Sequence, residues 1–174
     1  MRICFINIAL PGAGKSTLTQ KMVDYYRSQC YTVYVCSADD YFKANAVGEY
    51  RYERNKISKA HFNCKEKFNI CLNDKSEKLV VIVDNTNVKW EDSKYYREEA
   101  LKNDFELRFL EPDTNWKYDV QECSKRNTHN VFLFIMKNMW QSLINTLKEI
   151  DENGYDRRCG FVSGILQKSN KCRN

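Results

Sequence analysis

The sequence contains few of the residues that interrupt secondary structure or separate domains. Its 174 residues include two prolines and six glycines, and no Gly/Ser-rich or Pro-rich stretch divides it. Beyond the N-terminal segment the longest apolar run is six residues, 131–136, whereas a membrane-spanning helix needs about 20. Hydrophobic residues still make up 43% of the chain, which is too many for an unfolded protein. We therefore expect one folded domain and no association with a membrane.

The eight cysteines lack the spacing of a metal site or of a disulfide framework. No two of them form a C-x-x-C pair, and only two histidines are present to complete a metal site. Cysteines inside apolar or helical patterns behave as small hydrophobic residues. We therefore expect a reduced, intracellular protein, in the cytoplasm or the nucleus.

Acidic residues are absent from the last part of the sequence. The formal net charge is +5, and residues 157–174 alone contain five basic side chains and no acid, so residues 1–156 are balanced. We interpret residues 1–156 as the folded domain and residues 157–174 as a basic C-terminal tail. Such a tail is either a solvated segment or an electrostatic aid in holding a polyanion.

Hydrophobic periodicity predicts strands that alternate with helices. Near-continuous apolar runs at 2–10, 31–36, 79–83 and 105–110 predict buried strands. Helical spacing predicts helices at 15–29, 57–72, 87–102 and 116–124, and a long helix at 135–150. The expected fold class is α/β, with a parallel sheet that is flanked by helices on both faces.

A phosphate-binding loop (P-loop) is the strongest local signal. Residues 9–17, Ala-Leu-Pro-Gly-Ala-Gly-Lys-Ser-Thr, follow a predicted strand and open a predicted helix. Lys15 is suited to reach the β- and γ-phosphates of ATP, and the Ser16 hydroxyl is suited to ligate Mg²⁺. Ala9 stands where the general pattern has glycine, which a loop with ordinary dihedral angles tolerates. The predicted ATP-binding residues are Gly12, Ala13, Gly14, Lys15, Ser16 and Thr17.

The end of the 79–83 strand supplies a second magnesium ligand. Asp84 follows the strand directly, and a carboxylate there can hold Mg²⁺ together with Ser16. Asn85 comes next, where motor ATPases place an acid that activates water, and no Asn-Lys-x-Asp guanine motif is present. These features favour transfer of phosphate to an acceptor other than water.

Two further groups are candidates for the chemistry of transfer. Asp39 and Asp40 end the second predicted strand and so should reach the same edge of the sheet. One of these carboxylates can accept the proton of an attacking hydroxyl, and the alternative role for the pair is helix capping. Lys125 and Arg126 are candidates for the positive charge over the γ-phosphate, with Arg126 preferred as a lid residue.

Five segments in this order resemble the polynucleotide-kinase-like domain of the Nedd-four-binding protein two family. They are residues 10–17, 37–42, 82–87, 111–117 and Arg126-Asn127-x-His129, and the resemblance spans roughly residues 3–150. More distantly, the set is similar to phage polynucleotide 5′-kinase and to the kinase-like half of myelin cyclic nucleotide phosphodiesterase. The resemblance implies a P-loop kinase fold for residues 1–156, with a helical lid region near the C-terminus.

The resemblance also implies an activity. It implies transfer of the γ-phosphate of ATP, with Mg²⁺, to the 5′-hydroxyl end of RNA or DNA. Asp39 is then the catalytic base, Lys15 holds the phosphates, Arg126 belongs to the lid, and Ser16 and Asp84 hold the metal. No particular protein partner is implied.

The sequence departs from the phage-type pattern in two places. Phe42 and Asn130 stand where those enzymes have arginines. Two alternatives therefore stay open, an ATP-binding adaptor without phosphotransfer and a kinase for a small nucleoside-like acceptor. A groove for nucleic acid would combine basic residues with aromatic residues that stack on bases. Its candidates are Lys43, Tyr50, Arg51, Tyr52, Arg54, Lys56 and Lys59.

Overall fold

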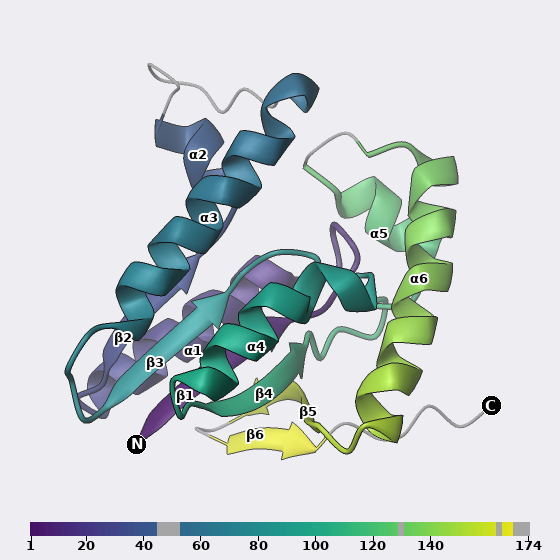
Figure 1. The fold of residues 1–174 in the computed structure, drawn as a ribbon. Coiled ribbons are helices and arrows are strands. Elements are labelled where there is room, and N and C mark those ends of the chain that lie inside the picture. The colour runs from purple at the N-terminus through teal and green to yellow at the C-terminus, as the bar shows by residue number, and fades with distance from the viewer. Residues whose placement is uncertain (45–52, 129–130, 163–164, 169–174) are drawn as a thin grey trace.

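The computed structural model describes residues 1–44, 53–128, 131–162 and 165–168. Its six-stranded sheet has the order β2-β3-β1-β4-β5-β6. The first five strands of this order are parallel, and β6 runs antiparallel to β5 (Figure 1). The strands are β1 (Arg2–Asn7), β2 (Thr32–Cys36), β3 (Leu79–Val83), β4 (Glu106–Glu111), β5 (Asp156–Val162) and β6 (Ile165–Lys168).

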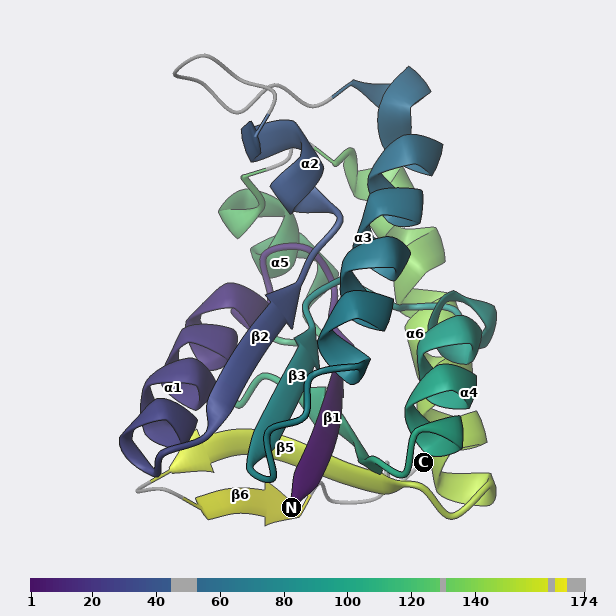
Figure 2. The ribbon, with the colours of Figure 1, turned by 60° about the vertical axis from the view of Figure 1, so that its left-hand side comes forward.

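Helices cover both faces of this sheet. Helix α1 packs on one face, and α3, α4 and α6 lie on the other (Figure 2). The α-helices are α1 (Lys15–Ser28), α2 (Asp39–Ala44), α3 (Ile57–Leu72), α4 (Lys94–Lys102), α5 (Val120–Arg126) and α6 (Leu133–Glu152). Two 3₁₀ helices, η1 (Arg54–Lys56) and η2 (Trp90–Ser93), precede α3 and α4.

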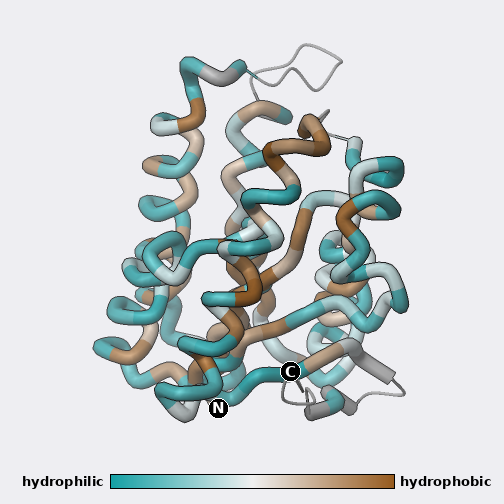
Figure 3. Tube along the Cα trace, turned by 90° about the vertical axis from the view of Figure 1, so that its right-hand side faces the viewer, coloured by the Kyte–Doolittle hydropathy of each residue, from teal (hydrophilic) through white to brown (hydrophobic). Residues whose placement is uncertain are grey.

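The core explains why the central strands are apolar along their whole length. In β1, Ile3 and Phe5 join the cluster under α1, whereas Cys4 and Ile6 join the cluster on the opposite face. All five residues of β3 are fully buried. A strand that is covered on both faces needs hydrophobic side chains at every position. Figure 3 shows hydrophobic residues concentrated in these central segments.

Two predicted helices begin later than the periodicity indicates. The predicted helix at 87–102 starts with η2, because Asn87 has a positive φ of 45° and its side chain bonds to Asn7 O. The predicted helix at 116–124 is α5, whose N-cap is Asp119. The Asp119 carboxylate accepts from the backbone N–H groups of Gln121 and Glu122, which fixes the start of the helix.

None of the helices among the described residues combines the length and the hydrophobicity of a membrane span.

The end of the chain corrects the sequence interpretation of residues 157–174. Residues 157–162 belong to β5, which pairs with β4 in parallel, and residues 165–168 form β6. Arg157 is 5% exposed, and its guanidinium forms ion pairs with Glu111 at 2.5 Å and Asp151 at 2.7 Å. The domain therefore continues past residue 156, and a basic residue assigned to a solvated tail lies in the core. Residues 169–174 of the predicted tail lie outside the described residues.

Candidate functional site

The phosphate-binding loop connects β1 to α1 at the carboxyl edge of the sheet. Gly12 and Gly14 have positive φ values of 80° and 97°. A Cβ at Gly12 would lie 2.1 Å from the carbonyl oxygen of Cys123 on α5. Gly14 is the N-cap of α1, so the first N–H groups of that helix face the space that a phosphate would occupy. Glycine is therefore required in the loop by backbone conformation and, at Gly12, by the closeness of α5.

Ala9 fits the loop without strain. The non-glycine residues with positive φ in the described part of the chain are Cys30, Asn87 and Asp104. Ala9 is buried, and its N–H donates to the carbonyl oxygen of Thr86 at 3.1 Å. The loop thus leaves β1 with ordinary dihedral angles, which is the condition under which alanine can replace glycine there.

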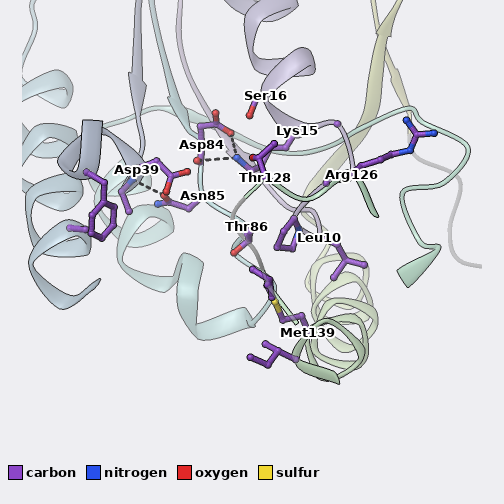
Figure 4. A pocket seen from close by; sticks show the side chains of 18 of the residues that line it. Leu10, Lys15, Ser16, Asp39, Asp84, Asn85, Thr86, Arg126, Thr128 and Met139 are labelled. Atoms are coloured by element: carbon purple, nitrogen blue, oxygen red, sulfur yellow. Dashed lines mark hydrogen bonds and ion pairs between the residues drawn. The ribbon is translucent and has the colours of Figure 1, made fainter. Parts of the chain in front are cut away.

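Lys15 and Asp84 form an ion pair at the centre of the site. Lys15 Nζ lies 2.6 Å from Asp84 Oδ1, and both side chains are largely buried (Figure 4). The amide of Asn7, which is fully buried at the end of β1, donates to Asp84 Oδ1 and to Thr19 Oγ1, each at 2.8 Å. The Asp84 carboxylate is therefore held by two donors. Because Lys15 already lines the cavity, its ammonium can leave the Asp84 carboxylate and bind a phosphate there after a short movement.

Ser16 and Asp84 provide the donor types that magnesium prefers. Ser16 and Asp84 line the same cavity as Lys15 (Figure 4). Mg²⁺ is usually held by one or two protein oxygens together with water and substrate phosphates. The described residues contain no cluster of three or more His, Cys, Asp and Glu side chains. The Ser16 hydroxyl and the Asp84 carboxylate thus fit a magnesium ion that binds together with a nucleotide.

The two neighbouring acids after β2 have different surroundings. Asp39, the first residue of α2, lines the same cavity as Lys15, Ser16 and Asp84. Asp40 instead forms an ion pair with Lys67 on α3 at 2.8 Å. The structure therefore distinguishes the two acids that the sequence offers together. Asp39 lines the cavity, and the ion pair of Asp40 connects α2 to α3.

Asn85 connects three elements beneath this wall of the cavity. Its Oδ1 accepts from the N–H of Ala38 at 2.9 Å, and its Nδ2 lies 3.5 Å from both Cys64 Sγ and Tyr96 Oη. Burial raises the pKa of Tyr96, so its hydroxyl stays protonated and donates to Cys64 Sγ at 3.2 Å. Asn85 thus fixes the segment that leads into Asp39. Sequence reasoning missed this role because the partners come from distant segments.

Trp116 links Arg126 to the phosphate loop. The Trp116 Nε1–H donates to Gly12 O at 3.2 Å, and the Thr114 hydroxyl donates to Ala13 O at 2.8 Å. The Arg126 guanidinium lies 4.1 Å from the centroid of the Trp116 ring. Arg126 lines the cavity, but Figure 4 shows its side chain extending away from Lys15. In this conformation the arginine is held next to the site and does not point at the phosphate position.

A cavity of about 750 Å³ unites these groups. Its polar part contains the loop, the acids and the amide described above. Its other walls are mainly apolar and come from the loop, the segment before α2, α2, α3, the segment before α6 and α6 itself. The apolar lining residues are Leu10, Pro11, Ala38, Phe42, Ile57, Ala60, Val131, Phe132, Ile135 and Met139.

The start of α6 exposes aromatic residues that the sequence analysis did not single out. Phe132 and Phe134 are 69% and 66% exposed. Their rings are nearly parallel, at 17°, with centroids 6.1 Å apart. Phe132 also lines the cavity, and the exposed Phe134 ring lies next to it. The signal in the sequence is the apolar run 131–136, most of which precedes the predicted helix at 135–150.

The basic groove expected after α2 is described only in part. Lys43 and Lys59 are exposed, and Lys56 forms an ion pair with Glu53. Phe42, which replaces an expected arginine, is 4% exposed in the wall of the cavity. The remaining expected positions lie outside the described residues or the described side chains: Tyr50, Arg51, Tyr52, Arg54, His129 and Asn130.

Comparison with known proteins supports part of the sequence interpretation. No protein-family model matches the chain. Human NEDD4-binding protein 2 is 34% identical over 128 residues, which cover 70% of this chain and 6% of that protein. The chain therefore spans only a small part of this relative, and the similarity concerns one segment of it.

Solved structures with similar folds include nucleotide-binding proteins. A chain of the PezAT toxin–antitoxin system of Streptococcus pneumoniae matches with a TM-score of 0.62 at 11% identity, covering 99% of this chain and 75% of that one. The APS kinase CysC of Mycobacterium tuberculosis, in complex with AMPPNP and APS, gives 0.50 at 14% identity, covering 72% and 68%. Chaetomium thermophilum Kti12, in complex with ADP-AlF3, also gives 0.50 at 14% identity, covering 82% and 79%. With its parallel strands, flanking helices and glycine-containing loop before α1, the chain has a P-loop kinase fold.

Proposed function

We propose that this chain is a phosphotransferase that uses ATP and Mg²⁺ to phosphorylate the 5′-hydroxyl end of a polynucleotide. One observation carries the proposal. Asp39 lines the same cavity as Lys15, Ser16 and Asp84, so a general base and a phosphate-binding loop face one space. Transfer to a hydroxyl requires this combination.

The nucleotide would be held by the loop. The N–H groups at the start of α1 and the Lys15 ammonium bind the β- and γ-phosphates, with Lys15 leaving its ion pair with Asp84. Asp84 and Ser16 would then hold Mg²⁺, which would neutralise negative charge on the phosphates. Asn7 keeps its hydrogen bond to Asp84 during this exchange, so the carboxylate stays in place.

The transfer step would use Asp39 and Arg126. The Asp39 carboxylate accepts the proton of the acceptor hydroxyl as its oxygen attacks the γ-phosphorus and the bond to the ADP oxygen breaks. Rotation of Arg126 away from the Trp116 ring brings its guanidinium over the cavity, where it stabilises the charge of the transferring group. Phe42 contributes no charge at this wall and adds a buried aromatic ring to it.

A polynucleotide acceptor is favoured by the rim of the cavity. Phe132 and Phe134 present a pair of nearly parallel rings to solvent. The first turn of α6 contains no acid, exposed Lys137 follows on the next turn, and Arg126 also lines the cavity. Aromatic rings that stack on bases, in basic surroundings, are typical of sites that bind single strands.

The test is transfer of labelled γ-phosphate from ATP to 5′-hydroxyl RNA and DNA oligonucleotides in the presence of Mg²⁺. We expect Asp39→Asn to lower the rate by about 10²- to 10⁴-fold while ATP still binds. Lys15→Ala should lose both transfer and ATP affinity. Asp40→Asn is the matched control, because its carboxylate pairs with Lys67, and it should retain most of the activity.

The alternatives predict different results in the same assay. ATP binding without transfer to any hydroxyl, in folded protein with Asp39 intact, would reject the kinase in favour of a nucleotide-binding adaptor. Efficient labelling of a mononucleoside, without a gain from longer oligonucleotides, would reject the polynucleotide in favour of a small acceptor. Equal losses in Asp39→Asn and Asp40→Asn would contradict the assignment of the base.

A further inference from the structure

Two cysteines contact each other at the two ends of the chain segment that contains Asp39. The Cys36 thiol, at the end of β2, donates to Cys71 Sγ on the last turn of α3 at 4.0 Å. The two residues are 0% and 4% exposed. A disulfide has an S–S distance of about 2.05 Å, so the two sulfurs need to approach by only about 2 Å. No backbone element stands between the two thiols, because they already share a hydrogen bond.

The charges around this pair differ for its two members. The hydrogen bond from Cys36 lowers the pKa of Cys71, and the ammonium of Lys67 adds to this effect. Lys67 lies one turn before Cys71 on α3, and its position is fixed by the ion pair with Asp40. Cys36 is fully buried, and its hydrogen bond to Cys71 together with this burial raises its pKa. Cys71 is therefore the member that reacts first, and Cys36 is suited to complete the bond.

We propose that Cys36 and Cys71 are a peroxide-sensitive dithiol that forms a disulfide between β2 and α3. The Cys71 thiolate attacks an oxygen of hydrogen peroxide, the O–O bond breaks, and a sulfenic acid and hydroxide result. The Cys36 thiolate then attacks the Cys71 sulfur, the S–O bond breaks, and a second hydroxide leaves. The two thiol protons convert both hydroxides to water. Two thiols and one peroxide thus give one disulfide and two waters.

The disulfide would cross-link the two ends of a segment that contributes residues to the cavity wall. The segment from Cys36 to Cys71 contains Asp39 and the α3 residues Ala60 and His61, which line the cavity. Cross-linking its two ends restricts the unfolded chain and stabilises the folded one. Cys64, the third cysteine of this region, is engaged by Tyr96 and Asn85, which leaves Cys36 and Cys71 as the matched pair.

Peptide mapping of peroxide-treated, folded protein tests the proposal. In wild-type protein the tryptic peptide 28–43 contains both Cys30 and Cys36, so a Cys30→Ser variant is used to make the assignment unambiguous. Cys71 lies alone in peptide 68–75, and Cys64 lies alone in peptide 60–65. After treatment with a small excess of hydrogen peroxide and blocking of free thiols, we expect peptides 28–43 and 68–75 to be joined and to separate on reduction.

A second measurement compares the thermal unfolding of the oxidised and the reduced protein. Oxidised Cys30→Ser protein should unfold at a temperature higher by about 5 °C or more than the reduced protein. Cys71→Ser in the same background should lose both the joined peptide and the shift. Joining of peptide 60–65 in place of 68–75, or oxidation of Cys71 only to sulfinic acid without a shift, would overturn the proposal. Neither readout requires phosphotransfer, so the result is independent of the proposed function.

Discussion

Replacement of Arg157 by alanine tests whether the end of the chain belongs to the core. Arg157 and Glu111 have side chains that are 3% and 2% exposed, and their ion pair is buried. Removing the arginine leaves the Glu111 carboxylate inside the protein with Lys117, 3.3 Å away, and the Tyr118 hydroxyl as partners. Loss of one member of a buried ion pair costs about 3–5 kcal/mol. Because two partners remain, we expect a loss close to 3 kcal/mol for Arg157→Ala.

The adjacent arginine provides a matched control. Arg158 pairs with Asp156 at 2.8 Å, but its side chain is 21% exposed and that of Asp156 is 33% exposed. Pairs in such surroundings contribute about 0–1 kcal/mol, so Arg158→Ala should change the free energy of unfolding by less than 1 kcal/mol. Urea titration of both variants measures the difference. With a slope of about 2 kcal/mol per molar urea, the midpoint should fall by about 1.5 M for Arg157→Ala and by less than about 0.5 M for Arg158→Ala. Equal, small changes in the two variants would refute a buried role for Arg157 and restore the solvated tail.

Three further predictions follow from other parts of the structure. Gly12→Ala places a Cβ 2.1 Å from a carbonyl oxygen of α5, so nucleotide affinity should fall by at least about tenfold, as measured by displacement of a fluorescent ATP analogue; unchanged affinity would contradict the close approach. Phe132→Leu combined with Phe134→Leu should raise the KM for a 5′-hydroxyl oligonucleotide by about fivefold or more and leave the KM for ATP unchanged, whereas parallel changes in both constants would indicate a structural effect. Hydrogen bonds from the side chain and the N–H of Ser76 lower the pKa of Asp74 to about 2, below its unfolded value of 3.8. The stabilisation from Asp74 is therefore present above pH 4 and is lost as the pH falls toward 2. Asp74→Asn should flatten the dependence of unfolding free energy on pH in that range, and an unchanged slope would reject the linkage.

Local patterns were sufficient to predict the strands β1 to β4 and the phosphate loop, but not β5 and β6. In β3 every residue is buried on both faces, so the sequence there is continuously aliphatic and its position can be read directly. The loop is equally readable, because the spacing of its glycines and its lysine between a strand and the next helix is a local pattern. The positions of Asp39 and Asp84 in one cavity follow from the rule that parallel strands end at the same edge.

Features that depend on distant partners could not be predicted in this way. Arg157 reads as a charge on a tail, because Glu111 lies 46 residues earlier in the sequence and nothing local shows their pairing. In the sequence, Asn85 is notable only because motor ATPases have an acid at this position. In the structure its side chain accepts from the N–H of Ala38 and lies 3.5 Å from Cys64 Sγ on α3. Asp39 and Asp40 are equivalent in sequence, and only the packing of α3 against α2 separates their roles. Each of these cases requires the tertiary structure.

The contact between Trp116 and the phosphate loop should make the intrinsic fluorescence of the protein sensitive to nucleotide binding. The indole donates to Gly12 O and carries the Arg126 guanidinium on its ring. Trp90 instead packs against Phe109 and Tyr155, and Trp140 lies on α6. A nucleotide that draws Arg126 over the cavity removes a charge from one indole face and leaves the other two tryptophans in place. The emission of Trp116 should therefore change with occupancy of the loop, so binding and lid movement can be followed in unlabelled protein.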